Sequence, residues 1–385
     1  MRRHCIKACC GLMAALAVFM GISAAAQVIT FSNAPAPRAI PRRASIILIL
    51  AHGLGCNDLS CYGQTNFQTP NLDKLAADGI RFTNFTGAAT AAEAEGAFMT
   101  GGKEGLTARN GAFRAQSRTV AQVLKDAGYF TGLFGQWDLG DENSSGAPWK
   151  QGFEDFGGYF GEPDAEDLYA DYRFRYAPDS IYDATNHVFH TFIGRETILA
   201  NEGGSRAKYV PDLFGQATAN FILAHQPDRY NHYQPFFLEL NYAIPGDHRT
   251  APPSDAPFSD EPWTRAQKNR AAVVFRLDGY IARLRQAVAA VGMTNNLLIF
   301  FTSDTVPEKG SGYFGKSPAR DGRVPMILAW PGMIAGGQVS GLKWSAADFL
   351  PTAARIGFAR TPKQARGKSI LPAILGRKEA QETFF

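Results

Sequence analysis

Residues that could take part in chemistry follow the first strongly apolar run of the chain. The run SIILILA (residues 45–51) is short and rich in leucine and β-branched residues, which is typical of a strand buried on both faces of a parallel sheet. It ends at His52 and Gly53, where a loop rich in glycine, asparagine and aspartate begins. Because ligands bind beyond the carboxyl ends of strands in open α/β sheets, these two residues are the first candidates for a functional site.

The elements that must position this loop alternate along the chain. Strands are predicted at 45–51, 81–85, 129–134, 235–242, 296–304 and 324–330, and helices at 69–80, 90–101, 119–127, 212–224, 265–291 and 346–356. Asn71 or Thr69 is the expected N-cap of the helix predicted at 69–80. Residues 159–208 lose this periodicity and are expected to form a long surface excursion whose Tyr169, Tyr172, Phe174 and Tyr176 pack onto the sheet or, alternatively, line a sugar-binding wall. The alternation predicts an α/β fold with a mostly parallel sheet covered on both faces.

Composition limits the class of partner. The 385 residues are 45% hydrophobic, which is enough for one large core or two unequal ones. The net charge of +4 is not concentrated in long blocks of either sign. We therefore expect neither a nucleic-acid partner nor attraction to an anionic membrane.

The amino terminus has the pattern of an export signal. Arg2, Arg3 and Lys7 precede the apolar run 8–22, and alanines 24–26 offer a cleavage site before Gln27. We predict a signal peptide at 1–26, a Pro-rich linker at 27–43 and an exported, periplasmic or secreted, protein without a stable membrane span. A retained anchor and a twin-arginine route are the alternatives. Only Cys56 and Cys61 would remain after cleavage, either as a local disulfide or as two thiols.

Several segments in sequence order resemble the sulfatases of the alkaline phosphatase-like superfamily. The quoted segments are ILILAHGLGCNDLSCYG, TPNLDKLAADGIRFTNF, MTGG, AQVLKDAGYFTGLFGQWDLGD, GFEDFGGYF, PFFLELNYAIP, LIFFTSD, RVPMILAWPG and SAADFLPTAARIG. The resemblance covers about residues 44–385 and implies a three-layer sandwich with a mostly parallel central sheet. The family's smaller C-terminal subdomain is expected to be missing, with a partner covering the edge or a truncated reading frame as explanations.

The resemblance implies a divalent ion, usually calcium, held by an Asp pair after the first strand and an Asp-Asn pair after a later one. These four positions are His52, Gly53, Asp304 and Thr305 here, so only Asp304 keeps its carboxylate. Calcium requires several oxygen ligands. We therefore expect no cofactor, with calcium only if the family site is functional after all; a zinc or transition-metal site on His52 and Asp304 is the alternative.

The family attacks sulfur with a formylglycine made from a Cys or Ser in the pattern C/S-x-P-x-R. Counting back from the Thr-Gly that ends the corresponding helix places Ala91 at the nucleophile position and Glu95 at the arginine. A methyl group can neither be oxidised to an aldehyde nor attack an ester. Thr90, one residue away, is the alternative hydroxyl nucleophile.

The remaining family positions are altered as well. Gln136 and Asp138 replace the Lys and His of Gly-Lys-Trp-His-Leu-Gly, and Gly246 replaces the His that protonates the leaving group. His248 would reach the pocket only after a loop shift, and Lys316 is a weak match to a further family lysine.

Taken together, these differences predict a sulfatase-shaped protein with a degenerate active site, retained to bind an unknown ligand or protein partner or for its structure. The alternative is a divergent sulfuric or phosphoric ester hydrolase with an unconventional site. Changing one member of a catalytic unit already costs orders of magnitude in rate. Here nearly every member differs, which favours the non-catalytic interpretation.

The signal-peptide pattern makes a first testable prediction. We expect the exported protein to begin near Gln27 and to be recovered in soluble form, because the apolar run is short and followed by small residues. N-terminal sequencing of exported material measures this directly. Recovery of a form that retains Met1 in membranes would contradict it.

Overall fold

The structure is a computed structural model of the chain. It describes residues 43–102, 113, 117–161, 167–183, 185, 188–227, 233–244, 257–307, 313–314 and 322–377. The predicted signal peptide and all of the predicted linker except Arg43 lie outside the described residues.

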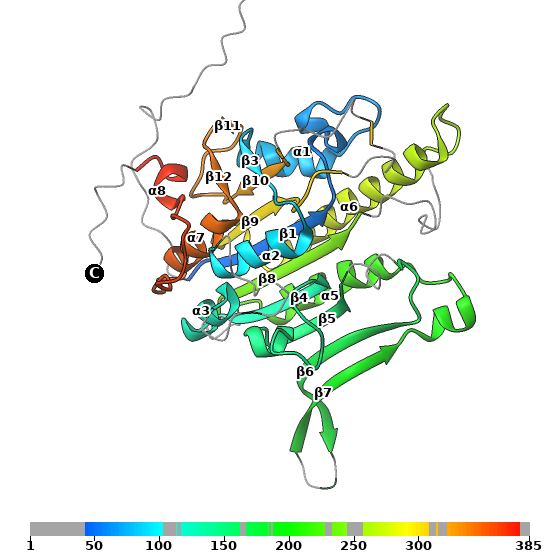
Figure 1. Cartoon of the computed structure of the whole chain (residues 1–385), viewed down its shortest axis with the longest axis vertical. Coiled ribbons are helices and arrows are strands. Elements are labelled where there is room, and N and C mark those ends of the chain that lie inside the picture. Colours follow the sequence, from blue (N-terminus) through cyan, green and yellow to red (C-terminus); the bar gives the residue numbers. More distant parts are fainter. Residues whose placement is uncertain are drawn as a thin grey trace, which may run out of the picture.

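A ten-stranded sheet forms the middle layer of the molecule (Figure 1), with the strand order β11-β2-β10-β9-β1-β8-β4-β5-β6-β7. Its five central strands are parallel: β9 (Leu297–Thr302), β1 (Ser45–His52), β8 (Phe236–Ala243), β4 (Phe130–Trp137) and β5 (Asp155–Phe160). The outer strands are β11 (Gln338–Ser340), β2 (Ile80–Phe82), β10 (Met326–Ala329), β6 (Tyr172–Asp183) and β7 (Val188–Thr197). A separate small sheet pairs β3 (Phe85–Thr86) with β12 (Trp344–Ser345).

Helices cover both faces of this sheet and bury two apolar layers. One face carries α1 (Pro70–Ala77), α5 (Val210–Ala224) and α6 (Arg265–Ala290), and the other carries α2 (Ala91–Thr100), α3 (Val120–Asp126), α7 (Phe349–Ile356) and α8 (Leu371–Ile374). β1 is buried along its whole length, with Ile47 and Ile49 in the first layer and Leu48 and Leu50 in the second. The predicted α/β three-layer sandwich is thus confirmed.

Three predicted elements differ from the structure. The strand predicted at 81–85 is two short strands, β2 and β3, which belong to different sheets. β4 continues to Trp137, three residues beyond the predicted end at Phe134, so Gln136 lies within a strand. Much of the expected surface excursion at 159–208 is a regular hairpin of β6 and β7, which extends from one end of the sheet (Figure 1). Arginine alternates with Tyr172, Phe174 and Tyr176 in β6, and this period of two was the overlooked sign of a strand.

The aromatic residues of β6 pack onto the sheet, as expected. The ring centroid of Phe174 lies 4.7 Å from that of Phe160, and Tyr176 stacks on Trp149 at 5.4 Å. The side chains of Arg173 and Arg175, which alternate with these rings, both pair with Glu196 of β7. Packing, rather than an open sugar-binding wall, therefore accounts for this part of the stripe.

The amino terminus of α1 is capped from a distant helix. Thr69 precedes the helix, but its side chain makes no capping hydrogen bond. Instead, the Asp278 carboxylate of α6 accepts hydrogen bonds from the backbone N–H groups of Asn71 (3.0 Å) and Leu72 (2.8 Å). The expectation of a local cap was wrong because a tertiary contact supplies the acceptor that the helix end needs.

A buried ion pair holds the loop that follows β1. The Arg270 guanidinium of α6 donates to Asp58 Oδ1 at 2.9 Å and Oδ2 at 2.7 Å, and also to the Gly53 carbonyl at 2.8 Å. Asp58 in turn accepts from the Gly55 N–H at 2.8 Å. Both charged side chains are almost completely buried, so each compensates the other's loss of water.

The structure also describes the two cysteines and tests the helices for a membrane span. Cys56 and Cys61 are free thiols in the structure and do not form a local disulfide. Within the described ranges, none of the helices combines the length and the apolar character needed to cross a bilayer.

The buried ion pair makes a second prediction. Asp58→Asn is expected to lower the free energy of unfolding by about 3–5 kcal/mol, because it leaves the Arg270 charge buried without its partner. The control is Lys74→Gln, which removes an exposed pair with Asp78 and should cost less than about 1 kcal/mol. Denaturant unfolding measures both; equal effects of the two changes would contradict the prediction.

Candidate functional site

His52 and Asp304 meet at the carboxyl ends of β1 and β9. The Nδ1 atom of His52 lies 2.9 Å from Asp304 Oδ2, and both side chains are buried. The parallel pairing of β1 with β9 ends at Leu50 and Thr302, which places the residues just beyond each strand side by side. The sequence prediction thus correctly selected the strand ends, and the fold brings these two residues into direct contact.

The other carboxylate oxygen of Asp304 is also occupied by protein donors. Oδ1 accepts from the backbone N–H groups of Gly53 (3.0 Å) and Thr305 (2.6 Å) and from the Thr305 hydroxyl (3.2 Å). Gly53 has a φ of 72°, a left-handed conformation that favours glycine and lets its N–H point at Asp304.

These residues do not fit a calcium ion. Calcium takes six to eight oxygen ligands, but Gly53 has no side chain and both Asp304 oxygens already accept hydrogen bonds. Among the described residues, no group of three or more His, Cys, Asp or Glu side chains is arranged to hold a metal ion.

The start of α2 carries Thr90 and Ala91, the two candidate nucleophile positions predicted from the sequence. Thr90 is the N-cap of this helix, and its hydroxyl accepts the Glu93 N–H at 3.2 Å. Ala91 is the first helical residue and is partly exposed. The Thr90 hydroxyl therefore has a structural partner, the usual one for a threonine in this place.

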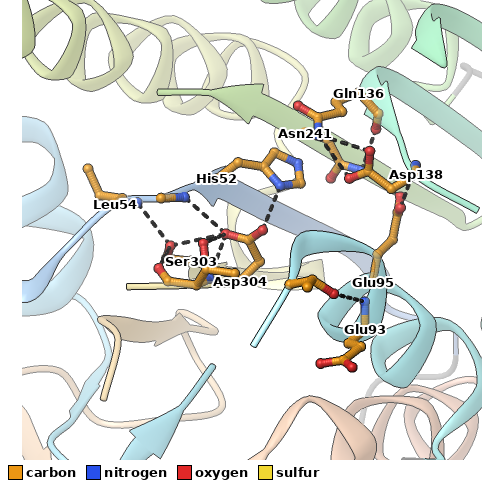
Figure 2. A network of polar contacts seen from close by, with 12 residues as sticks. His52, Leu54, Glu93, Glu95, Gln136, Asp138, Asn241, Ser303 and Asp304 are labelled. Carbon is orange, nitrogen blue, oxygen red and sulfur yellow. Dashed lines mark hydrogen bonds and ion pairs between the residues drawn. The ribbon is translucent and has the colours of Figure 1, made fainter. Parts of the chain in front are cut away.

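Glu95, one turn further along α2, points toward the end of β4. Its side chain is fully buried, and its Oε2 atom accepts the Asp138 N–H at 2.8 Å. Gln136 Nε2 donates to both carboxylate oxygens of Asp138, at 3.0 and 2.8 Å. Figure 2 shows His52 between the Asp304 loop and this group of side chains.

Glu239 and Asn241 of β8 complete the cluster, and sequence reasoning missed both. Asn241 Nδ2 donates to Glu95 Oε1 (3.0 Å), Glu239 Oε1 (3.2 Å) and the Gln136 carbonyl (2.8 Å). Two polar residues at alternate positions of an otherwise apolar central strand were the available signal, because such residues are rarely buried without a partner. Gly135 permits the close approach, since a Cβ there would lie 1.8 Å from the Asn241 carbonyl oxygen.

Burial and like charges shift the proton affinities of this cluster. Burial raises the pKa of Glu239 to about 8, and burial together with the Asp138 and Glu239 carboxylates raises the pKa of Glu95 well above its usual value. Burial alone would lower the pKa of His52, but Asp304 and the nearby carboxylates outweigh it and raise that pKa to about 9. At neutral pH the cluster therefore holds an imidazolium beside carboxyl groups that retain protons.

Four buried polar atoms of the cluster have no hydrogen-bond partner within the described part of the chain. They are His52 Nε2, Gln136 Oε1, Glu239 Oε2 and Asn241 Oδ1. Such atoms are costly unless something pairs with them. The site thus has unused hydrogen-bonding capacity, which includes a donor on the His52 imidazolium and acceptors on the Gln136 and Asn241 amides. Gly246, His248 and Lys316, the other positions named from the sequence, lie outside the described residues.

The fold and the arrangement of these strand ends define an alkaline phosphatase-like α/β protein, and the comparisons agree. The Sulfatase family profile matches residues 44–356. The chain is 30% identical over 377 residues to arylsulfatase A from Homo sapiens, covering 90% of this chain and 71% of that protein. It is 27% identical over 385 residues to N-acetylgalactosamine-6-sulfatase from Canis lupus familiaris, covering 90% and 68%. The chain therefore belongs to the sulfatase family.

Solved structures share the fold. The crystal structure of Ps i-CgsB in complex with k-i-k-neocarrahexaose superposes with a TM-score of 0.69 at 25% identity, over 87% of this chain and 77% of that one. The phosphonate monoester hydrolase of Agrobacterium radiobacter superposes with a TM-score of 0.57 at 20% identity, over 89% and 79%. The second likeness concerns the fold alone.

The raised pKa values predict how stability depends on pH. The pKa of His52 rises from 6.5 to about 9 on folding. Its contribution to the free energy of unfolding is therefore complete below pH 6.5 and is lost as the pH rises through about 9. The pKa of Glu239 rises from 4.5 to about 8 on folding. The free energy of unfolding therefore falls as the pH rises from about 4.5 to about 8, because the unfolded chain ionises there while the buried carboxyl group stays protonated.

Glu239→Gln should therefore flatten the fall in unfolding free energy between pH 5 and 8, by up to about 1.4 kcal/mol per pH unit. Denaturant unfolding of wild type and variant across this range measures the difference. Parallel pH profiles for the two proteins would contradict the shifted pKa of Glu239.

Proposed function

We propose that this chain is a sulfatase-family protein with a degenerate active site, which does not hydrolyse sulfate esters and acts by binding. The observation that carries the proposal is the loss of positively charged side chains where the family binds its anionic substrate. Glu95 and Asp138 lie in contact at the family's arginine and histidine positions. Burial keeps the Glu95 carboxyl group protonated, so it offers a sulfate no positive charge. An ionised Asp138 about 4 Å from a sulfate oxygen would cost on the order of 4 kcal/mol at an effective dielectric near 20.

Loss of the nucleophile and of the cation supports the same proposal. Ala91 offers no atom that could attack sulfur. Both Asp304 oxygens are engaged by protein donors, and His52 brings the cluster a positive charge of its own. An internal imidazolium thus stands where the family uses a metal ion, but it provides neither open coordination positions nor a second positive charge.

The alternative is an ester hydrolase with an unconventional site. His52 favours it, because the Nε2 atom is buried without a partner among the described residues and could hold a proton for a leaving group. The alternative lacks a nucleophile, since Thr90 caps α2. The export signal predicted at 1–26 would place the protein outside the cytoplasm.

Calcium and sulfate binding test this proposal. Titration calorimetry of the purified protein is expected to show no micromolar binding of either ion, and intact-mass spectrometry no formylglycine. 4-Nitrophenyl sulfate and 4-nitrophenyl phosphate should not be turned over. Calcium binding that Asp304→Ala abolishes and that the exposed-residue control Asp260→Ala retains would overturn the proposal, as would turnover of either ester.

A further inference from the structure

A groove lies at the edge of the sheet opposite the candidate site. It occupies about 410 Å³ between the end of α3 and the loop that follows α7, and its lining includes Arg118, Phe358, Arg360 and Lys363. α3 ends just before β4 begins, whereas His52 lies at the end of β1, and both strands run parallel to β8. The groove is thus separate from the altered family site, and its volume is in the range of small-ligand sites.

The groove has a positive rim. Arg360 and Lys363 are exposed, and residues 355–368 contain five basic and no acidic residues. Arg118 pairs with Asp126 at the same rim, so the one acidic side chain among the described residues of the groove lining is already neutralised by a cation. An anionic group placed in the groove would therefore have unneutralised cations beside it.

An exposed aromatic ring stands at the groove in a strained conformation. Phe358 has a φ of 55° and is 64% exposed, and apart from Arg43 it is the only non-glycine residue with positive φ among those described. Its position follows the end of α7, where Ala359 N–H donates to the Ala354 carbonyl at 2.8 Å. Helices that end in this way usually place glycine at the left-handed residue.

The neighbouring glycine explains why the strain falls on Phe358. Gly357 comes one residue earlier, and a Cβ there would lie 2.7 Å from Leu124 Cδ2. A side chain at 357 would therefore crowd Leu124 where α7 packs on α3, and the left-handed conformation falls on the next residue. Nothing in this packing requires a large ring at 358, and strained residues of this kind concentrate at ligand sites.

From the cavity, the cations and the strained ring, we infer that this groove binds an anionic saccharide. The exposed face of Phe358 suits the apolar face of a sugar ring, and Arg360 and Lys363 suit a carboxylate or sulfate on it. The Thr361 hydroxyl on the same lining suits the sugar's hydroxyl groups. A single ring does not make the repeated stacking platform that single-stranded nucleic acids use.

Calorimetry with defined probes tests the assignment on the mature protein. An oligogalacturonate is the carboxylated probe, a sulfated galactose oligosaccharide the sulfated one, and a neutral galactose oligosaccharide and a glutamate-rich peptide are the comparisons. Binding of at least one anionic saccharide, weakened by added salt, is expected. Binding of neither, or equally tight binding of the peptide, would overturn the assignment.

Matched variants place the ligand. Arg360→Gln with Lys363→Gln should raise the Kd about tenfold or more, whereas Arg265→Gln with Lys343→Gln, an equal change of charge at exposed positions outside the groove lining, should leave it unchanged. Equal effects of the two pairs would indicate attraction by net charge and would overturn the assignment.

Variants of Phe358 separate a role in saccharide binding from a role in stability. Phe358→Gly should raise the melting temperature by about 2 °C by relieving the left-handed strain, while weakening saccharide binding. Phe358→Ala should weaken binding without that gain. Unchanged binding in both variants would overturn the role of the ring. These outcomes do not depend on sulfate ester turnover, so this inference and the proposed function fail separately.

Discussion

The parallel pairing of β1 with β8 on one side and β9 on the other is the constraint on which the candidate site depends. It aligns Leu50 with Asn241 and with Thr302, and so sets the level at which all three strands end. His52 then meets Asp304, 252 residues further along the chain. Because side chains alternate between faces, a shift of one residue in β1 would turn His52 and the whole buried strand to the wrong layers.

The charges of the site at these strand ends are balanced by the protein's own side chains. His52 and Asp304 neutralise each other where a cation would need open carboxylates. Glu95 and Glu239 share the Asn241 amide and hold their protons because burial penalises their charge. The fold therefore tolerates four carboxyl groups close together, because protons and the His52 imidazolium offset their charges.

The two edges of the sheet differ in the sign and the solvent exposure of their ionisable side chains. The carboxyl edge concentrates buried acids, with Glu95 and Glu239 completely inaccessible to solvent. The opposite edge exposes cations along 355–368 beside the ring of Phe358. The carboxyl edge therefore keeps its ionisable groups away from solvent, whereas the groove formed by helix ends presents exposed cations.

The sequence by itself determined most of the central strands, most of the helices that cover the sheet, and where along the chain the candidate site lies. Those conclusions rest on local periodicity and on the side chain present at each position. Only the tertiary structure decided that Glu239 and Asn241 join the site, that Asp278 caps α1, and that the strain at the end of α7 falls on Phe358. Each of these depends on contacts between segments far apart in the chain, because burial and close approach arise only when the layers are assembled.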